Sequence, residues 1–145
     1  MSLRIKFKVV TPEKTVYEDE IDQATLPVTD GEVTILPNHR SYVETLKAGE
    51  IILKKEGKEI SLSAAGGFLE FDKNNLVILA DRAERAEEID LKRAKEARIR
   101  AEELKKEKIS TDDEDYARVA AMIEKEAARI KVAKKHRTRR GMRID

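Results

Sequence analysis

The spacing of the apolar residues changes near residue 89, and this change constrains the fold more than any other feature of the 145-residue chain. Before it, apolar and polar residues alternate in short runs separated by turn residues. After it, alanine and aliphatic residues recur at every third or fourth position. Alternation by two is typical of a strand with one buried face, and spacing by three and four is typical of a helix. The chain is therefore predicted to form a sheet domain followed by helices.

The first part of the chain, residues 1–85, is predicted to be all-β. Between Leu3 and Val9 every second residue is apolar and the residues between them are basic. Further short runs of β-branched and apolar residues follow, up to Leu79. Turn signals separate these runs at intervals of roughly eight to twelve residues, which indicates an antiparallel sandwich or barrel.

The second part, residues 86–135, is predicted to be an antiparallel helical hairpin. Asp90 has the side chain to cap a first helix by accepting a backbone N–H. A break is expected near Ser110, and Thr111 with Glu114 three residues later is a capping-box signal for a second helix. Two helices joined by only a few residues pack against each other in opposite directions.

The seam of the predicted hairpin is poor in apolar area. Ala94, Ala97 and Ala101 form its stripe on the first helix. At about 25 cal/mol per Å² of buried apolar surface, alanines contribute little stability. We therefore expect a mobile hairpin that folds against a partner and also extends away from it.

Arg93 and Arg100 lie seven positions apart and so share one face of the first helix. The simpler interpretation is a solvated face of a helical hairpin. The alternative is a phosphate site, because two guanidinium groups on one face suit the oxygens of a nucleotide. The spacing alone does not choose between them.

Residues 136–145 form a basic tail that we expect to be disordered, because a highly charged segment with few apolar residues to bury lacks the means to fold. A contact with an acidic protein or with nucleic acid is the functional alternative. No aromatic residue interrupts the basic residues, which argues against binding to single-stranded nucleic acid.

The composition argues against several classes of function. The chain has no Cys, which excludes disulfides, thiol catalysis and thiolate metal sites. Its two histidines, His39 and His136, are far apart in sequence, and no catalytic or metal-binding motif is present. A formal net charge of +1 creates no general attraction to nucleic acid or to membranes. No apolar run approaches the roughly 20 residues of a membrane span, so we expect a soluble, cytosolic protein. Because no catalytic or metal-binding motif is present, we expect neither a metal nor a catalytic residue.

Three stretches of the chain are similar to the epsilon subunit of bacterial F-type ATP synthases. Thr29–His39 resembles a DGExxxLPxH loop and strand of that family. Ser63–Glu70 resembles its SGGFxE strand. Leu79–Asp81, followed by Ile89–Ala94, resembles its domain joint and its I/L-D-x-x-R-A motif. Their order and spacing extend the resemblance over nearly the whole chain, apart from the basic tail.

The resemblance implies an N-terminal sandwich of about ten short antiparallel strands and a C-terminal antiparallel α-helical hairpin. It implies a non-catalytic rotor subunit of the central stalk, which couples ion flow to ATP synthesis. The expected partners are the gamma subunit, the ring of c subunits and the catalytic head of alpha and beta subunits. The expected location is the cytoplasmic side of the bacterial inner membrane, which the chain reaches only through the complex.

In this family the extended hairpin enters the catalytic head and inhibits ATP hydrolysis, and in some members the folded hairpin binds ATP. The resemblance admits ATP as a regulatory ligand that is not hydrolysed, and it requires no cofactor. The nucleotide-binding residues of the family map onto Glu84, Ile89, Asp90, Arg93, Ala94, Arg100, Lys125 and Arg129. The loop that faces the c ring and gamma maps onto Asp30, Glu32 and His39.

Two other functions remain alternatives. One is a free-standing ATP-binding sensor, and the other is an adaptor that binds nucleic acid or protein through the basic tail. The resemblance itself predicts no nucleic-acid partner. It also leads to the hypothesis that the basic tail stabilises the extended hairpin, so that removing residues 136–145 raises ATP hydrolysis by the complex.

Overall fold

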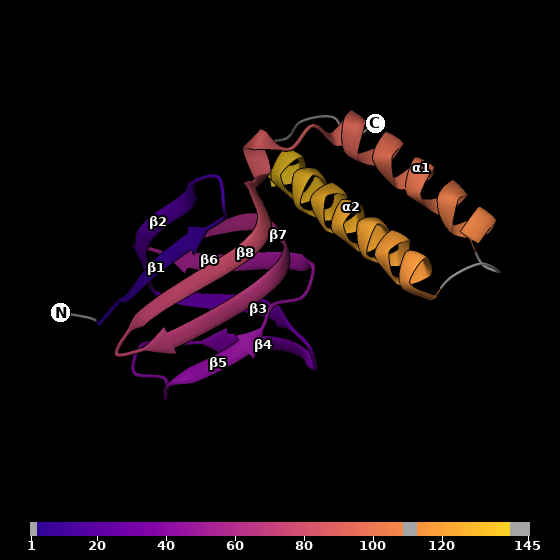
Figure 1. Ribbon diagram of the computed structural model, residues 1–145. Helices are drawn as coiled ribbons and strands as arrows, with labels where there is room; N and C mark the ends of the chain where they lie inside the picture. Colours follow the sequence, from indigo (N-terminus) through magenta and orange to yellow (C-terminus); the bar gives the residue numbers. More distant parts are fainter. Residues whose placement is uncertain (1–2, 109–112, 140–145) are drawn as a thin grey trace.

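The computed structural model of the chain describes residues 3–108 and 113–139. In this part of the chain it contains eight strands, one short 3-10 helix and two long helices (Figure 1). Their bounds are β1 (Ile5–Val10), β2 (Thr15–Ile21), β3 (Gln23–Val28), β4 (Gly31–Ile35), β5 (Tyr42–Thr45), β6 (Gly49–Lys55), β7 (Lys58–Asp72), β8 (Asn75–Arg85), η1 (Ala86–Glu88), α1 (Leu91–Lys108) and α2 (Asp113–Arg139).

The strands form one sheet that folds over on itself. Its order is β2-β1-β8-β7-β6-β3-β4, and β5 pairs with β7 outside this path. The first half of β7, from Lys58 to Ala64, pairs with β6, and Phe68–Phe71 pair with β5. Strand β7 therefore belongs to both layers of the resulting sandwich.

Two glycines allow β7 to pass from one layer to the other. Gly66 and Gly67 have φ values of 70° and 111°, which side-chain-bearing residues rarely adopt. A Cβ atom at Gly67 would also collide with the backbone of Leu79 and Ala80 on β8. Close approach of the two backbones thus requires glycine at this position.

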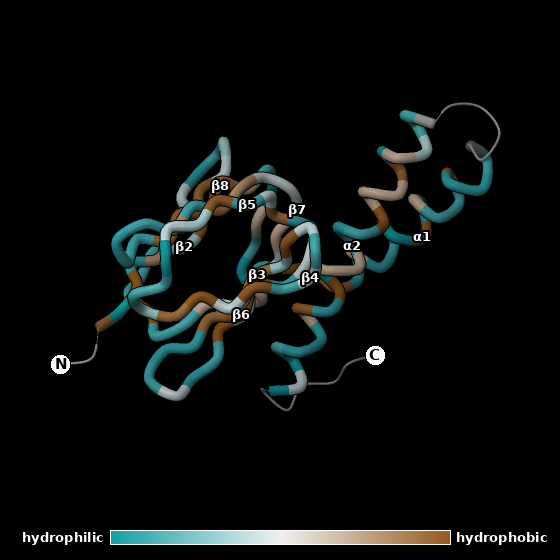
Figure 2. The backbone as a smooth tube through the Cα atoms, turned by 90° about the horizontal axis from the view of Figure 1, so that it is seen from below, coloured by the Kyte–Doolittle hydropathy of each residue, from teal (hydrophilic) through white to brown (hydrophobic). Residues whose placement is uncertain are grey.

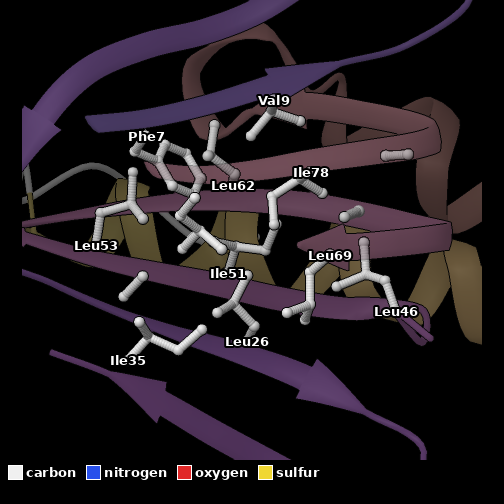
Figure 3. Packing of buried hydrophobic residues seen from close by; sticks show 14 of the residues in the cluster. Phe7, Val9, Leu26, Ile35, Leu46, Ile51, Leu53, Leu62, Leu69 and Ile78 are labelled. Carbon is white, nitrogen blue, oxygen red and sulfur yellow. The ribbon is translucent and has the colours of Figure 1, made fainter. Parts of the chain in front are cut away.

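The hydrophobic core lies between the two layers. Phe7 from β1, Ile51 from β6 and Leu69 from β7 point into the same space in Figure 3. Each is at most 1% exposed, and the polar residues that alternate with them face outward. Figure 2 shows the corresponding alternation of colour along the strands, whereas the two helices are largely hydrophilic.

The predicted fold class, a β-sandwich followed by a helical hairpin, is confirmed. The described residues contain eight strands rather than about ten, and one of them, β7, runs without a break from Lys58 to Asp72 through Gly66 and Gly67. Strand β8 continues to Arg85 through a segment expected to be a joint, since its backbone pairs with β7 as far as Leu62. The expectation of a wholly antiparallel sheet was also wrong, because β1 and β8 pair in parallel.

The two helices lie side by side, with the C-terminal end of α2 beside the sheet domain and its other end pointing away from it (Figures 1 and 2). Helix α2 continues to Arg139, so residues 136–139 of the predicted disordered tail are helical. The remaining tail, 140–145, the predicted break near Ser110 and Thr111 of the predicted capping box lie outside the described residues. The part of the chain that the structure describes has no helix long and apolar enough to cross a membrane.

Candidate functional site at the contact between α2 and the sheet domain

Helix α2 covers the outer face of strands β6 and β7. In these strands Ile51 and Leu62 point into the sandwich core, so their neighbours Glu50 and Ser63 point outward. Glu50, Ser61 and Ser63 are nevertheless buried, and α2 packs against both strands. The polar outer face of these two strands is therefore a contact surface.

A row of cations on α2 meets two carboxylates of this face. Lys131, Lys135 and Arg139 are spaced by four residues and so share one side of the helix. Lys135 Nζ lies 3.2 Å from Oε2 of Glu50, and Lys131 Nζ lies 3.9 Å from Oε1 of Glu50. Arg139 donates hydrogen bonds to the carboxylate and the carbonyl oxygen of Glu59 on β7. The side chain of Glu50 is only 3% exposed, so its charge depends on these lysines for compensation.

A second ionic network joins α2 to the end of β8. Arg129 Nη1 lies 2.7 Å from Oε2 of Glu126 on the same helix, and Arg129 Nε lies 3.0 Å from Oε1 of Glu84. Burial opposes the charge of Arg129, but the hydrogen bond that Arg129 donates to Glu126 and the attraction of Glu84 outweigh this effect and raise the pKa of Arg129 above its ordinary value. Lys125 Nζ lies 3.5 Å from Oε1 of Glu126. Both cations of α2 that were assigned to a nucleotide are thus paired with carboxylates of the chain itself.

The apolar residues of the hairpin form a cluster separate from the sandwich core. It contains Ala86, Ile89, Leu91, Ala94, Ile130, Val132 and Ala133. No residue of this cluster belongs to a strand, and the buried cluster of the sandwich contains no residue of either helix. The two clusters are therefore separate, and ion pairs to Glu50, Glu59 and Glu84 join α2 to the strands.

The residues expected to bind nucleotide fall into separate groups. Ile89 and Ala94 are buried in the hairpin cluster. Asp90 caps α1 by accepting a hydrogen bond from the backbone N–H of Arg93 at 3.1 Å, as predicted. The side chain of Arg93 is 84% exposed, and Arg100 is also exposed.

The structure therefore brings Glu84, Lys125 and Arg129 into one network through Glu126. Asp90 and Arg93 meet at the start of α1, where Arg93 Nε lies 3.6 Å from Oδ2 of Asp90. Whether these residues hold a nucleotide stays a prediction.

The three residues expected to face the c ring and gamma are distributed along β4. Asp30 lies in the exposed turn before this strand, and Glu32 is exposed on it. His39 follows the strand, and its Nδ1 lies 2.7 Å from the carbonyl oxygen of Arg40. Its ring packs edge-on against Phe71, with 5.7 Å between the ring centroids. His39 thus also has a structural role at the edge of the core.

An apolar surface on the other layer was not recognised in the sequence. Val43 on β5, Phe68 on β7 and Leu79 on β8 are 68%, 58% and 57% exposed. Phe68 pairs with Leu79 of β8 on one side and with Thr45 of β5 on the other. Val43 lies two residues before Thr45 and therefore on the same face of β5. The side chains of Val43, Phe68 and Leu79 thus share one face of adjacent strands. We call this set the apolar face; exposed apolar groups gathered in this way mark interaction surfaces.

The carboxylates of the α2 contact were also missed. Glu50, Glu59 and Glu126 are scattered in sequence and look like ordinary surface residues. The four-residue spacing of Lys131, Lys135 and Arg139 was the one signal that pointed to a common contact. Among residues 3–108 and 113–139, no three acidic or histidine side chains cluster as metal ligands would.

Comparison with known proteins gives matches over almost the whole chain. The family described as ATP synthase, Delta/Epsilon chain, beta-sandwich domain matches residues 4–86. The family described as ATP synthase, Delta/Epsilon chain, long alpha-helix domain matches residues 87–134.

Two curated relatives and one solved structure extend this result. An ATP synthase epsilon chain of Herpetosiphon aurantiacus is 39% identical over 135 residues, which is 93% of this chain and 98% of the relative. One from Desulforamulus reducens is 42% identical over 128 residues, covering 88% and 96%. A chain in the mitochondrial ATP synthase structure of Euglena gracilis has the same fold, with a TM-score of 0.75 at 20% identity over 92% of this chain and 82% of that chain. The chain belongs to the family of ATP synthase epsilon chains.

Proposed function

We propose that the chain is the non-catalytic central-stalk subunit of a bacterial F-type ATP synthase, coupling ion translocation to ATP synthesis. The family membership carries this proposal, because the matches include both the sandwich and the hairpin. The solved relative comes from a structure that contains F1 and a c-ring, which supports the same kind of assembly here. The proposed location is peripheral, on the cytoplasmic side of the bacterial membrane.

The apolar face supports a contact with the gamma subunit. Its three large side chains are exposed in the chain alone and need a partner to remove them from water. The ring of c subunits is the proposed partner of Asp30, Glu32 and His39. The alpha and beta subunits of the catalytic head are the proposed partners of the extended hairpin.

Inhibition of ATP hydrolysis is proposed to reside in the hairpin. The observation that supports it is the separation of the two hydrophobic clusters, which lets the hairpin leave the strands without opening the sandwich core. A ligand that prefers one hairpin position shifts the balance between the two positions. ATP is proposed as such a ligand, with Arg93 as a cation that the solvent reaches freely.

Co-purification with a gamma-type subunit tests the stalk assignment. Phe68→Asp places a charge on the apolar face and is expected to abolish capture of gamma. Leu3→Asp is the matched control, because Leu3 is 56% exposed but lies before β1 and outside the apolar face. Equal capture by the two variants would reject the apolar face as the gamma contact. Failure of the unmodified chain to capture gamma would reject the stalk assignment.

A further inference from the structure

We infer that Glu50 and Glu59 form an electrostatic latch that holds the hairpin against the sheet domain, and that ionic strength sets how firmly it closes. The latch consists of these two carboxylates and the cationic row Lys131, Lys135 and Arg139. The latch acts on the hairpin in its docked position, so this inference rests on the proposed function, in which the hairpin is mobile.

The arrangement of the apolar residues is the first argument. The hairpin cluster ties α1 and α2 to the joint through Ala86 and Ile89, and it includes no strand residue. That cluster keeps the two helices together and anchored at the hinge whether or not α2 lies on the strands. Docking of α2 must then depend on contacts that lie beyond the hinge.

The position of the charges is the second argument. Each acid of the latch belongs to the sheet domain and each cation belongs to α2, so moving the hairpin separates all the pairs together. Lys135 bridges the two acids, since its Nζ lies 3.2 Å from Oε2 of Glu50 and 3.9 Å from Oε2 of Glu59. The pairs therefore act as one network rather than as isolated surface ion pairs.

Burial is the third argument. Docking removes the carboxylate of Glu50 from water, leaving it 3% exposed, while Lys131 and Lys135 stay 67% and 32% exposed. A buried carboxylate without its cations opposes docking, and the same carboxylate with both lysines favours it. Because the lysines remain in contact with solvent, dissolved salt screens them, with a Debye length of about 10 Å at 0.1 M.

The experiment uses the full chain carrying two fluorophores. The chain has no Cys, so Glu18→Cys on β2 and Glu103→Cys on α1, both exposed, provide two unique labelling positions. Energy transfer between the two dyes reports docking, and far-UV circular dichroism shows whether the helices stay folded. We expect transfer to fall as NaCl rises from about 0.05 to 0.5 M while helicity is unchanged.

Glu50→Gln removes the central charge of the latch with little change in shape. The substitution is expected to lower the ratio of docked to undocked chains roughly tenfold. The reason is that Lys135 then donates to a neutral amide, and a hydrogen bond to a neutral acceptor is weaker than one to a carboxylate. Glu70→Gln is the matched control, because it makes the same charge change at an exposed position in the part of β7 that pairs with β5. Equal docking of the two variants, or docking that does not respond to salt, would overturn the latch.

A charge exchange provides a second test. Glu59→Lys and Arg139→Glu are each expected to loosen docking, and the double variant to restore part of it, because the exchanged pair attracts again. Additive loosening in the double variant would count against the pair. These readouts use the isolated chain, so the latch can hold even if the chain fails to inhibit hydrolysis in the complex, and the two failures are distinguishable.

Discussion

The guanidinium Nε of Arg129 lies 3.0 Å from Oε1 of Glu84, which pairs α2 with the last part of β8. The same guanidinium contacts Glu126, whose side chain is 6% exposed. In the docked hairpin Arg129 is thus already neutralised by two carboxylates. Its first role in this position is to join the two domains.

Arg129→Gln should destabilise the docked hairpin. Among the described residues, the substitution leaves buried Glu126 with Lys125 as its remaining cationic partner, and the cost is expected to be about 2 kcal/mol of unfolding free energy. Urea denaturation followed by far-UV circular dichroism measures this loss. Arg118→Gln is the control, since that arginine is exposed and its surface pair with Asp115 should contribute less than about 0.5 kcal/mol. Equal losses in the two variants would contradict the network.

Gly67→Ala should be severely destabilising. The new methyl group would strike the backbone of β8, and the φ of 111° is unfavourable for alanine. We expect a loss of at least about 3 kcal/mol from strain and displacement together. Gly57→Ala provides the comparison, because its φ of 76° is also positive but nothing lies within 4 Å of the added Cβ. A thermal melt that shows similar losses at both positions would be inconsistent with close packing of β7 on β8.

Tyr17 should make the sheet domain sensitive to alkali. Burial, and then the nearby charge of Asp19, raises the pKa of Tyr17 to about 12. The ordinary tyrosine pKa is about 10, so the folded protein holds a proton that the unfolded chain releases first. This contribution to stability is complete below about pH 10 and is lost as the pH rises toward about 12.

Absorbance at the tyrosinate band tests the Tyr17 assignment. Of the three tyrosines, one is expected to titrate near pH 12 in the folded protein, and Tyr17→Phe should remove that step. The variant should also lose less stability between pH 10 and 12 than the unmodified chain. A high-pH step that survives in Tyr17→Phe would assign the shifted group elsewhere.

ATP binding should depend on Arg93. Calorimetric titration of ATP into the isolated chain is expected to give saturable binding that weakens at least roughly tenfold in Arg93→Ala, because a charged hydrogen bond to phosphate is lost. Arg98→Ala is the control on the same helix, since Arg98 pairs with Glu102. Equal weakening in both variants would assign the effect to the helix rather than to the site. Absence of binding at millimolar ATP would reject the nucleotide proposal and leave the stalk assignment intact.

The elements of the fold were largely predictable from local patterns. Alternation along β1 and the three-four spacing after residue 89 specify strand and helix directly, and Asp90 caps α1 as its side chain suggests. The length of β7 was not predictable, because Gly66 and Gly67 resemble a turn. Only their place on β7, with Gly66 beside Asp81 and Gly67 opposite Ala80, shows that they bend a continuous strand.

The contact between α2 and the strands was likewise not predictable from the sequence, because residues far apart in the chain form it. Ser61 and Ser63 alternate with core residues and so resemble a solvated face until α2 is found above them. Glu50 and Lys135 are 85 positions apart, a separation across which no local spacing indicates a pair. The nucleotide residues were assigned from a motif, and the motif did not show that Arg129 already has carboxylate partners.

Whether the hairpin inhibits the enzyme is tested by ATP hydrolysis of the F-type complex assembled either with the full chain or with a chain that ends at Glu88. The shortened chain keeps every residue of the sandwich core, and equal co-purification with gamma should confirm that it occupies the stalk. We expect faster hydrolysis by the complex that lacks the hairpin. Equal hydrolysis by the two complexes at equal occupancy would contradict the assignment of inhibition to the hairpin.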